Sequence, residues 1–249
     1  MSKKLQGNVA VVTGASKGIG ASIAKALADE GASVVVNFSS SKQDADRVVA
    51  DITGRGGKAL AVQGNVSKQA DVERLFSETK KAYGRLDILV NNAGVYEFAP
   101  LEGVTEELFH KHFNVNVLGL LLTTKEAVKH MGPGGSIINM GSVASSIRMP
   151  NSTVYAASKA AVDAITGVLA KELGPRHIRV NSINPGMIET EGTHAGGLVG
   201  SDFQKTVETL APLGRMGQPD DIWPTAVCLP SSDSKYMTGE TLLVSGGIR

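Results

Sequence analysis

Residues 9–20 read VAVVTGASKGIG, a short apolar run that passes directly into a glycine-rich turn. The run has the length and β-branched content of a buried strand, and apolar residues with helical spacing follow in residues 19–27. Gly14, Gly18 and Gly20 would let the backbone turn sharply and approach a pyrophosphate, whose charge a helix N-terminus stabilises. The segment therefore predicts a strand, a dinucleotide-binding loop and a helix.

The same alternation of apolar runs and amphipathic stretches continues to the C-terminus. The predicted strands cover Val9–Thr13, Ser33–Phe38, Ala59–Gln63, Leu86–Val90, Ser136–Met140, Arg179–Ile183 and Thr241–Val244. These runs are apolar or bounded by Gly and Asn rather than alternating, which is typical of strands buried on both faces. We predict one α/β domain over residues 1–249, with a doubly wound, Rossmann-like parallel sheet of about seven strands and helices on both faces. The glycine-rich segment 188–211 shows little periodicity and is predicted to be a mobile substrate lid within that domain.

Composition restricts the possible partners. The chain has 25 Lys and Arg against 24 Asp and Glu, and this balance favours neither a nucleic-acid groove nor a basic membrane face. The single cysteine, Cys228, cannot form an internal disulfide, and the N-terminal apolar run is too short for a signal peptide or a membrane span. The five histidines show no metal-ligand spacing. We expect a cytoplasmic protein with a small-molecule substrate, no metal, no nucleic acid and no membrane.

Tyr155 and Lys159 stand four residues apart, so a helix would place the phenol and the ammonium on one face. A phenol has an ordinary pKa of about 10, and a nearby ammonium together with an oxidised nicotinamide would favour the phenolate. Tyr155 could then exchange a proton with an alcohol or carbonyl oxygen. Ser142 follows the predicted fifth strand, so its hydroxyl would reach the same cleft and bind that oxygen. This pattern indicates an oxidoreductase.

The glycine loop, Asn91-Asn92-Ala93-Gly94, the Tyr155/Lys159 pair and Pro185-Gly186 occur in an order that resembles the single-domain branch of the short-chain dehydrogenase/reductase family. The resemblance spans residues 13–190. It implies that Asn116 completes a catalytic set with Ser142, Tyr155 and Lys159; its side chain would interrupt a helix and hold a water linked to the lysine. It also implies a homotetramer, formed through the helices that contain Asn116 and Tyr155 and through the C-terminal strand.

The end of the second strand predicts the cofactor. Phe38 stands where relatives that prefer NAD usually carry Asp, and Ser39, Ser40 and Lys17 suit the 2′-phosphate of NADP. We predict NADP(H), with NAD(H) as a weaker or dual cofactor. Asn65 replaces the aspartate that holds the adenine amino group in relatives, and its amide oxygen can still accept a hydrogen bond. The predicted cofactor-binding residues are Gly14, Ser16, Lys17, Gly18, Ile19, Gly20, Phe38, Ser39, Ser40, Asn65, Val66, Asn92, Ala93, Gly94, Tyr155, Lys159, Pro185, Gly186, Ile188 and Thr190.

Together these features predict a reversible, NADP(H)-dependent reduction of small ketones or 3-oxo compounds to secondary alcohols, with Tyr155 as acid and base. Two related activities stay open: a 3-oxoacyl-[acyl-carrier-protein] reductase and a sugar dehydrogenase resembling glucose 1-dehydrogenase. A different class, a non-catalytic dinucleotide sensor, would typically lose the acid-base pair that this chain keeps. Candidates for the substrate wall are Tyr96, Phe98, Met187, Ile188, His194 and Leu198.

Overall fold

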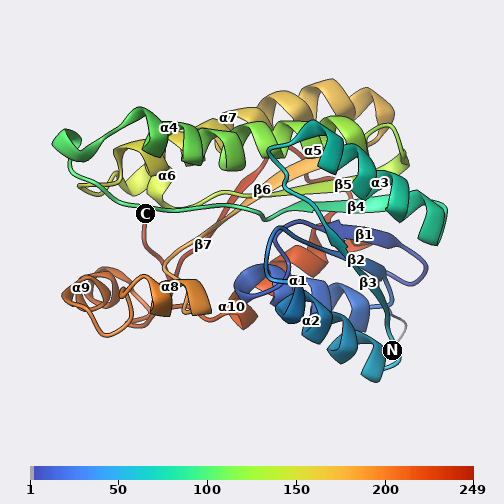
Figure 1. Ribbon diagram of the computed structural model, residues 1–249, viewed down its shortest axis with the longest axis horizontal. Helices are drawn as coiled ribbons and strands as arrows, with labels where there is room; N and C mark the ends of the chain where they lie inside the picture. The colour runs from blue at the N-terminus through green and yellow to red at the C-terminus, as the bar shows by residue number, and fades with distance from the viewer. Residues whose placement is uncertain (1–2) are drawn as a thin grey trace.

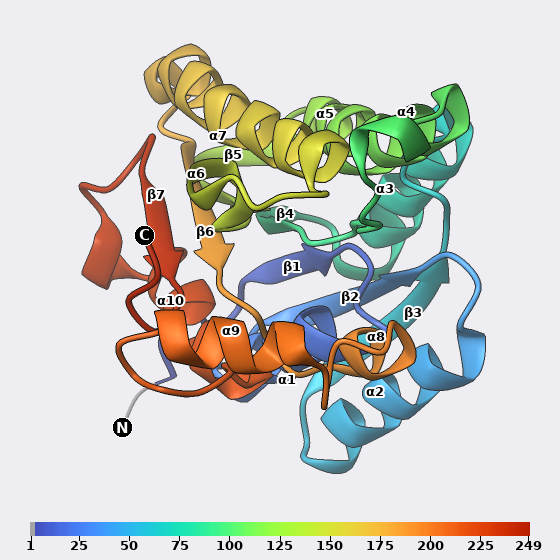
Figure 2. The same ribbon diagram turned by 90° about the vertical axis from the view of Figure 1, so that its left-hand side faces the viewer.

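A computed structural model describes residues 3–249 and contains one parallel sheet of seven strands in the order β3-β2-β1-β4-β5-β6-β7 (Figures 1 and 2). The strands are β1 (Val9–Val12), β2 (Ser33–Phe38), β3 (Lys58–Gln63), β4 (Leu86–Asn91), β5 (Met131–Met140), β6 (Arg179–Pro185) and β7 (Thr241–Val244). The strand order reverses between β1 and β4. In open parallel sheets, ligands bind at the carboxyl ends of the strands beside such a reversal.

Helices cover both faces of the sheet. They are α1 (Gly18–Asp29), α2 (Lys42–Gly54), α3 (Gln69–Tyr83), α4 (Glu106–Phe113), α5 (Gly119–Ala127), α6 (Ala144–Ile147), α7 (Thr153–Leu173), α8 (Glu191–Ala195), α9 (Asp202–Leu210) and α10 (Pro219–Cys228). Figure 1 shows α3, α4, α5 and α7 on one face, and α1, α2 and α10 on the other. The predicted doubly wound α/β fold is confirmed. Among the described residues, no helix combines the length and the apolar character needed to cross a membrane.

The core divides into two layers because neighbouring strand residues point to opposite faces of the sheet. Ala10 and Val12 pack with α1 and α10 on one side, whereas Val11 packs with α3 and α7 on the other. All three side chains are fully buried. This two-sided burial is why apolar residues predominate in the central strands.

A row of polar side chains crosses the buried centre of the sheet. Asn91 pairs in register with Asn139, and Asn139 pairs with Ser182, so the row runs over β4, β5 and β6. Asn91 Nδ2 donates to Asn139 Oδ1 at 3.0 Å, and Thr123 Oγ1 on α5 donates to Asn91 Oδ1 at 2.6 Å. Asn139 Nδ2 donates to Thr166 Oγ1 on α7 at 2.9 Å. The row therefore ties the sheet to both helices above it.

The ends of β1, β3, β4 and β6 differ from the predicted ones by one or two residues, and two larger differences occur elsewhere. Strand β5 begins at Met131, five residues before the predicted start at Ser136, because Met131 pairs with Leu86 across an irregular register. The segment 188–211, predicted as a mobile substrate lid with little periodicity, contains the helices α8 and α9. In α9, Phe203 and Val207 are four residues apart and share one helix face, a periodicity that the flanking glycines concealed.

Candidate active site

The glycine loop joins β1 to α1 at the carboxyl edge of the sheet. Gly14 and Gly18 have φ values of 61° and 54°, in the left-handed region that favours glycine. A Cβ on Gly20 would lie 2.7 Å from the carbonyl oxygen of Gly14, so a larger residue there would push the loop open. Asn92 Nδ2 donates to the carbonyl oxygens of Thr13 and Gly14 at 2.9 and 3.1 Å. Asn92 therefore fixes the start of the glycine loop.

Ser142 follows β5, and Tyr155 lies on the first turn of α7, facing it. Burial raises the pKa of the Tyr155 phenol above its usual value of 10, while the interaction with the Ser142 hydroxyl acts in the opposite direction. That Lys159 and an oxidised nicotinamide together favour the phenolate stays a prediction; among the chain's own residues, burial has the largest effect on this pKa. The phenol is therefore held in its protonated form at neutral pH.

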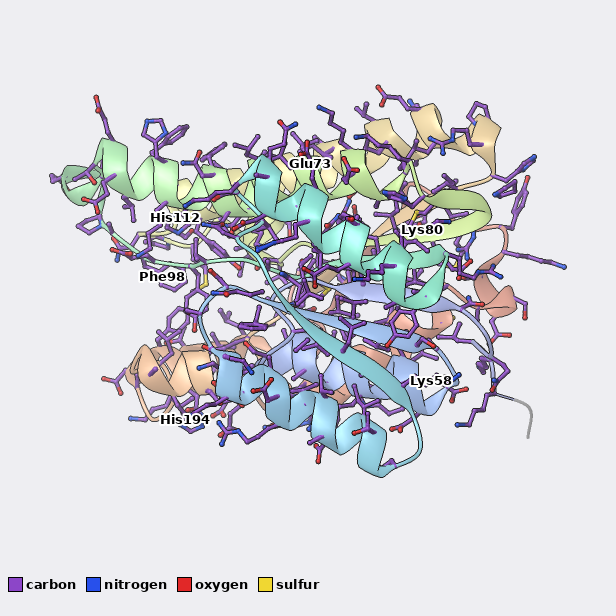
Figure 3. All side chains as sticks on the ribbon, turned by 45° about the vertical axis from the view of Figure 1, so that its right-hand side comes forward. Lys58, Glu73, Lys80, Phe98, His112 and His194 are labelled. Atoms are coloured by element: carbon purple, nitrogen blue, oxygen red, sulfur yellow. The ribbon has the colours of Figure 1, made fainter. Side chains whose placement is uncertain are left out.

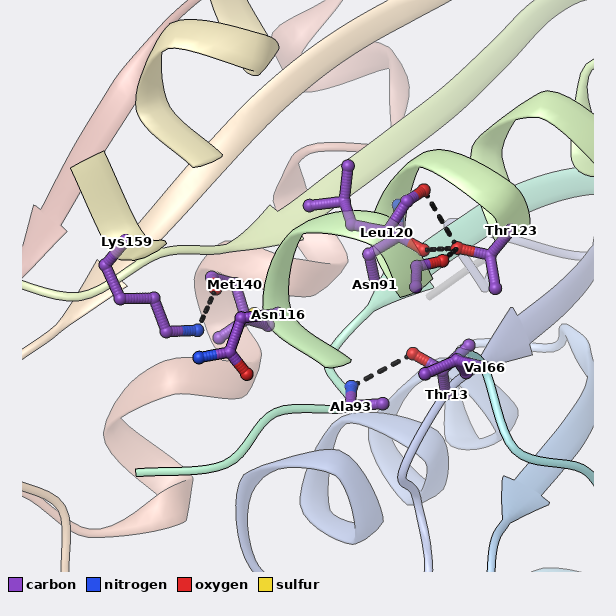
Figure 4. A pocket seen from close by; sticks show the side chains of 10 residues that line it. Thr13, Val66, Asn91, Ala93, Asn116, Leu120, Thr123, Met140 and Lys159 are labelled. Carbon is purple, nitrogen blue, oxygen red and sulfur yellow. Dashed lines mark hydrogen bonds between the residues drawn. The ribbon is translucent and has the colours of Figure 1, made fainter. Parts of the chain in front are cut away.

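Lys159 lies one turn further along α7, and its ammonium is 5.9 Å from the centroid of the Tyr155 ring. Its Nζ donates to the carbonyl oxygen of Met140 at 2.8 Å (Figure 4). Burial lowers the pKa of Lys159 to about 8, so part of the population loses its charge near physiological pH. A lysine in this condition can pass a proton as well as hold a charge.

Asn116 lies in a π-helical turn, Asn114–Leu118, between α4 and α5, which confirms that the helix is interrupted there. The amide of Asn116 accepts from Val95 N at 2.8 Å, and donates to Val95 O and Ser158 Oγ at 3.0 Å each. Beside it lies a small cavity of about 10 Å³, which Asn116, Met140 and Lys159 help to line (Figure 4). That volume is about the space that one water needs. The water predicted between asparagine and lysine stays a prediction.

One larger cavity, of about 500 Å³, brings most of the predicted site together. Its lining includes the predicted residues Lys17, Gly18, Ile19, Gly20, Asn92, Gly94, Ser142, Tyr155, Lys159, Pro185, Gly186, Ile188 and Thr190. The remaining predicted residues lie outside that lining: Gly14, Ser16, Phe38, Ser39, Ser40, Asn65, Val66, Ala93 and Asn116. The cavity thus extends from the glycine loop past Tyr155.

The residues predicted to contact the adenosine part of the cofactor lie at or near the carboxyl ends of β2 and β3. Phe38 is buried in the core, so an aromatic ring, not a carboxylate, ends β2. Lys17 Nζ lies 3.1 Å from a carboxylate oxygen of Asp44. Asn65 Oδ1 accepts from Ser67 N and Oγ at 3.0 and 2.8 Å. The oxygen predicted to contact adenine is therefore already used by a local turn.

The residues present fit a dinucleotide. Among residues 3–249, no carboxylate ends β2, and Lys17, at the N-cap of α1, makes no side-chain capping bond to the helix. The first N–H groups of α1 therefore face the loop, where a pyrophosphate can accept from them. A Cβ on Gly14 would lie 2.8 Å from Ala93 Cα, so only glycine lets the loop pack this closely against the segment after β4.

Aromatic side chains form the other end of the large cavity. The ring centroids of Phe98 and Tyr155 are 5.8 Å apart, and those of Phe98 and Phe203 are 6.4 Å apart. Tyr96 completes this group, which we call the aromatic wall: Tyr96, Phe98, Phe203 and the ring of Tyr155. Sequence reasoning named Tyr96 and Phe98 but missed Phe203, whose helical spacing with Val207 could have revealed it.

Most of the other predicted wall residues also line the cavity, namely Met187, Ile188 and Leu198. His194 is the exception, because its Nε2 lies 2.8 Å from Glu189 in a separate groove against α1 and α10. In Figure 3, His194 lies on the side of α8 away from Phe98. Predicting it as a wall residue was wrong.

Comparisons with known proteins agree with this geometry. A family model described as enoyl-(acyl carrier protein) reductase matches residues 14–249. An uncharacterized oxidoreductase of Methylorubrum extorquens is 56% identical over 99% of both chains, and a hydroxynaphthalene reductase-like protein of Metarhizium brunneum is 38% identical over 98% of this chain and 96% of the relative. The crystal structure of an angucycline C-6 ketoreductase with bound NADP is 34% identical, covers 100% of this chain and 98% of its own, and superposes with a TM-score of 0.93. The chain belongs to the short-chain dehydrogenase/reductase family.

Proposed function

We propose that this oxidoreductase uses NADP(H) to reduce flat, apolar ketones to secondary alcohols. The observation that carries the proposal is the position of Ser142 and Tyr155 on one cavity that extends from the glycine loop to the aromatic wall. A dinucleotide on the loop and a ketone against the wall would meet at these two side chains. Membership of the family establishes that the protein is an oxidoreductase. The cofactor preference, the direction of the reaction and the substrate are what we propose.

The protonation states of the catalytic residues suit reduction. A bound nicotinamide would supply the hydride for the carbonyl carbon. Ser142 holds the carbonyl oxygen by a hydrogen bond, and Tyr155, whose pKa is raised by burial, gives its phenol proton to that oxygen as negative charge develops. Lys159, with a pKa of about 8 and its Nζ 5.9 Å from the centroid of the Tyr155 ring, then returns a proton to the phenolate.

NADP(H) is the proposed cofactor because Lys17 lies near the end of β2 and no acidic residue ends that strand. The angucycline ketoreductase, which contains NADP, is similar over the whole chain. The pairing of Lys17 with Asp44 weakens its pull on a 2′-phosphate, so we expect a preference for NADP(H) with NAD(H) still usable.

The substrate class follows from the aromatic wall. Rings at centroid distances of 5.8 to 6.4 Å offer edges and faces to a flat ligand, and such contacts are worth about 0.5–1.5 kcal/mol each beyond burial. A sugar would leave its hydroxyls against these rings without partners, which disfavours the sugar dehydrogenase alternative. The hydroxynaphthalene reductase-like and angucycline relatives carry names of polycyclic aromatic compounds, which supports the same class. The small ketone of the sequence prediction is therefore extended to a bicyclic aromatic one.

The test follows the oxidation of NADPH and of NADH with 2-tetralone, a 3-oxo ester, a 3-oxoacyl thioester and a sugar lactone. We expect NADPH and 2-tetralone to give the highest kcat/KM, and Tyr155→Phe to lower kcat at least 100-fold while NADPH still binds. Phe203→Leu should raise KM for 2-tetralone and leave KM for the 3-oxo ester nearly unchanged. Turnover of the thioester alone would favour the acyl-carrier-protein reductase, and tight NADPH binding without turnover of any carbonyl would favour the sensor.

A further inference from the structure

The N-terminus of α1 lacks a capping side chain of its own. Lys17 occupies the N-cap position in an extended conformation and makes no side-chain capping bond, and no acidic residue lies in the first turn. The N–H groups there carry the positive end of the helix dipole. Water, a ligand or a group from elsewhere in the chain must satisfy them, and the dipole favours an anion.

In the structure the anion is the carboxylate of Glu191 on α8, 173 residues after Gly18 in the sequence. Gly18 N donates to Glu191 Oε2 at 3.0 Å. Glu191 is the first residue of α8, and this short helix is held in place by its own capping box, in which Thr190 Oγ1 accepts from Thr193 N and Thr193 Oγ1 accepts from Thr190 N. The backbone of α8 thus delivers the carboxylate to the glycine loop.

Helix α8 also approaches both ends of the large cavity. A Cβ on Gly18 would lie 3.1 Å from Thr190 Cγ2, and a Cβ on Gly192 would lie 2.8 Å from the hydroxyl oxygen of Tyr96 in the aromatic wall. Figure 2 shows α8 beside α1 and below the carboxyl ends of the strands. The carboxylate contact therefore lies where the helix that covers the cavity meets the loop that binds a dinucleotide.

We infer that Glu191 is a built-in competitor for the pyrophosphate of the cofactor. One N–H cannot donate fully to the carboxylate and to a phosphate oxygen, and the like charges of the two groups repel at this distance. Glu191 must leave Gly18 when the pyrophosphate binds, so the carboxylate lowers cofactor affinity and its release loosens α8. This inference rests on the proposed dinucleotide site and adds to it a residue that sets how tightly the cofactor is held.

The expected effect is modest because the contact is exposed. A charge at a helix terminus changes an equilibrium by about two- to fivefold at low salt, and added salt screens it. Glu191→Gln keeps the shape of the side chain and removes its charge, so we expect a Kd for NADPH about two- to fivefold lower than that of the unchanged protein. The difference should shrink at 0.5 M NaCl, where the Debye length falls to a few ångströms.

Asp220→Asn is the matched control. Asp220 lies in the same groove between α1, α8 and α10, and its carboxylate accepts from Ser22 Oγ at 3.2 Å without touching Gly18. Calorimetric titration would measure the Kd of NADPH, inorganic pyrophosphate and adenosine 2′-monophosphate for all three proteins. We expect Glu191→Gln to tighten NADPH and pyrophosphate, to leave the adenosine monophosphate unchanged, and to differ from Asp220→Asn, which changes none of them.

An NADPH affinity that is unchanged or weakened in Glu191→Gln would overturn the inference. Equal tightening in Asp220→Asn would also overturn it, because the cause would then be the overall charge of the groove. Failure of the proposed function looks different. A protein that binds neither NADPH nor NADH would refute the cofactor proposal, while tighter pyrophosphate binding by Glu191→Gln would still show the competition at Gly18.

Discussion

Replacing Lys159 by Met should make the folded protein more stable at neutral pH while abolishing turnover. Lys159 is 6% exposed, and burial lowers its pKa from 10.5 to about 8, so folding penalises its charged form. At 1.36 kcal/mol per pKa unit, this penalty amounts to about 3 kcal/mol at pH 7. Loss of the hydrogen bond to the Met140 carbonyl offsets about 1 kcal/mol. We expect a net gain of about 2 kcal/mol in the free energy of unfolding.

The stability advantage of Lys159→Met declines as pH rises through a defined window. A lysine whose pKa is lowered by folding binds fewer protons in the folded state than in the unfolded state, so the stability of the unchanged protein rises as pH increases from about 8 to 10.5. The advantage of Lys159→Met should therefore fall by about 2 kcal/mol between pH 7 and pH 9.5. Urea unfolding at a fixed protein concentration would measure both values.

Lys171→Met supplies the control, because Lys171 is exposed on the same helix and should change stability by no more than about 0.5 kcal/mol at either pH. A Lys159→Met protein that is less stable than the unchanged one by the same amount at pH 7 and pH 9.5 would refute the reasoning. That result would mean that the charge of Lys159 is fully compensated in the folded protein.

Three further changes test other parts of the structure. His112→Leu should destabilise the fold by about 1–3 kcal/mol and raise KM for the ketone, because the buried ring accepts from Glu97 N at 3.0 Å and packs against Tyr155. Urea unfolding and steady-state kinetics would measure the two effects. An unchanged KM would show that His112 does not support the aromatic wall. Lys17→Ala should lower the NADPH/NADH ratio of kcat/KM about tenfold through loss of a phosphate partner, whereas an equal fall for both cofactors would contradict a role at the 2′-phosphate. Val168→Asp should dissociate the proposed homotetramer in sedimentation velocity, since Val168 is 55% exposed on α7, and an unaltered sedimentation coefficient would place the interface elsewhere.

The sequence was sufficient for most of the fold because short apolar runs mark its strands. Strands β2 and β7 begin and end where predicted, since their apolar runs need no tertiary information. The early start of β5 depends on the pairing of Met131 with Leu86, a contact between distant residues that the local Gly-Pro-Gly sequence hides. Helices α8 and α9 were not predicted because they are short and lie in a glycine-rich segment, which hides the helical spacing of their apolar residues.

The candidate site was predictable where a motif fixes spacing along one element, as for Tyr155 and Lys159. It was not predictable where burial decides the chemistry. The raised pKa of Tyr155 depends on how deeply α7 packs, and the Glu191–Gly18 contact joins segments 173 residues apart. The helical spacing of Phe203 and Val207 is present in the sequence, but only the packing of α9 brings Phe203 near Phe98.

The polar row of Asn91, Asn139 and Ser182 has a consequence for how the sheet assembles. A purely apolar strand can slide along its neighbour and still bury hydrocarbon, but a slip of one residue here would turn these amides toward the opposite face, away from Thr123 and Thr166. Each buried amide left without a partner costs about 1–3 kcal/mol. The row therefore selects one register of β4, β5 and β6 among several that would bury a similar amount of apolar surface.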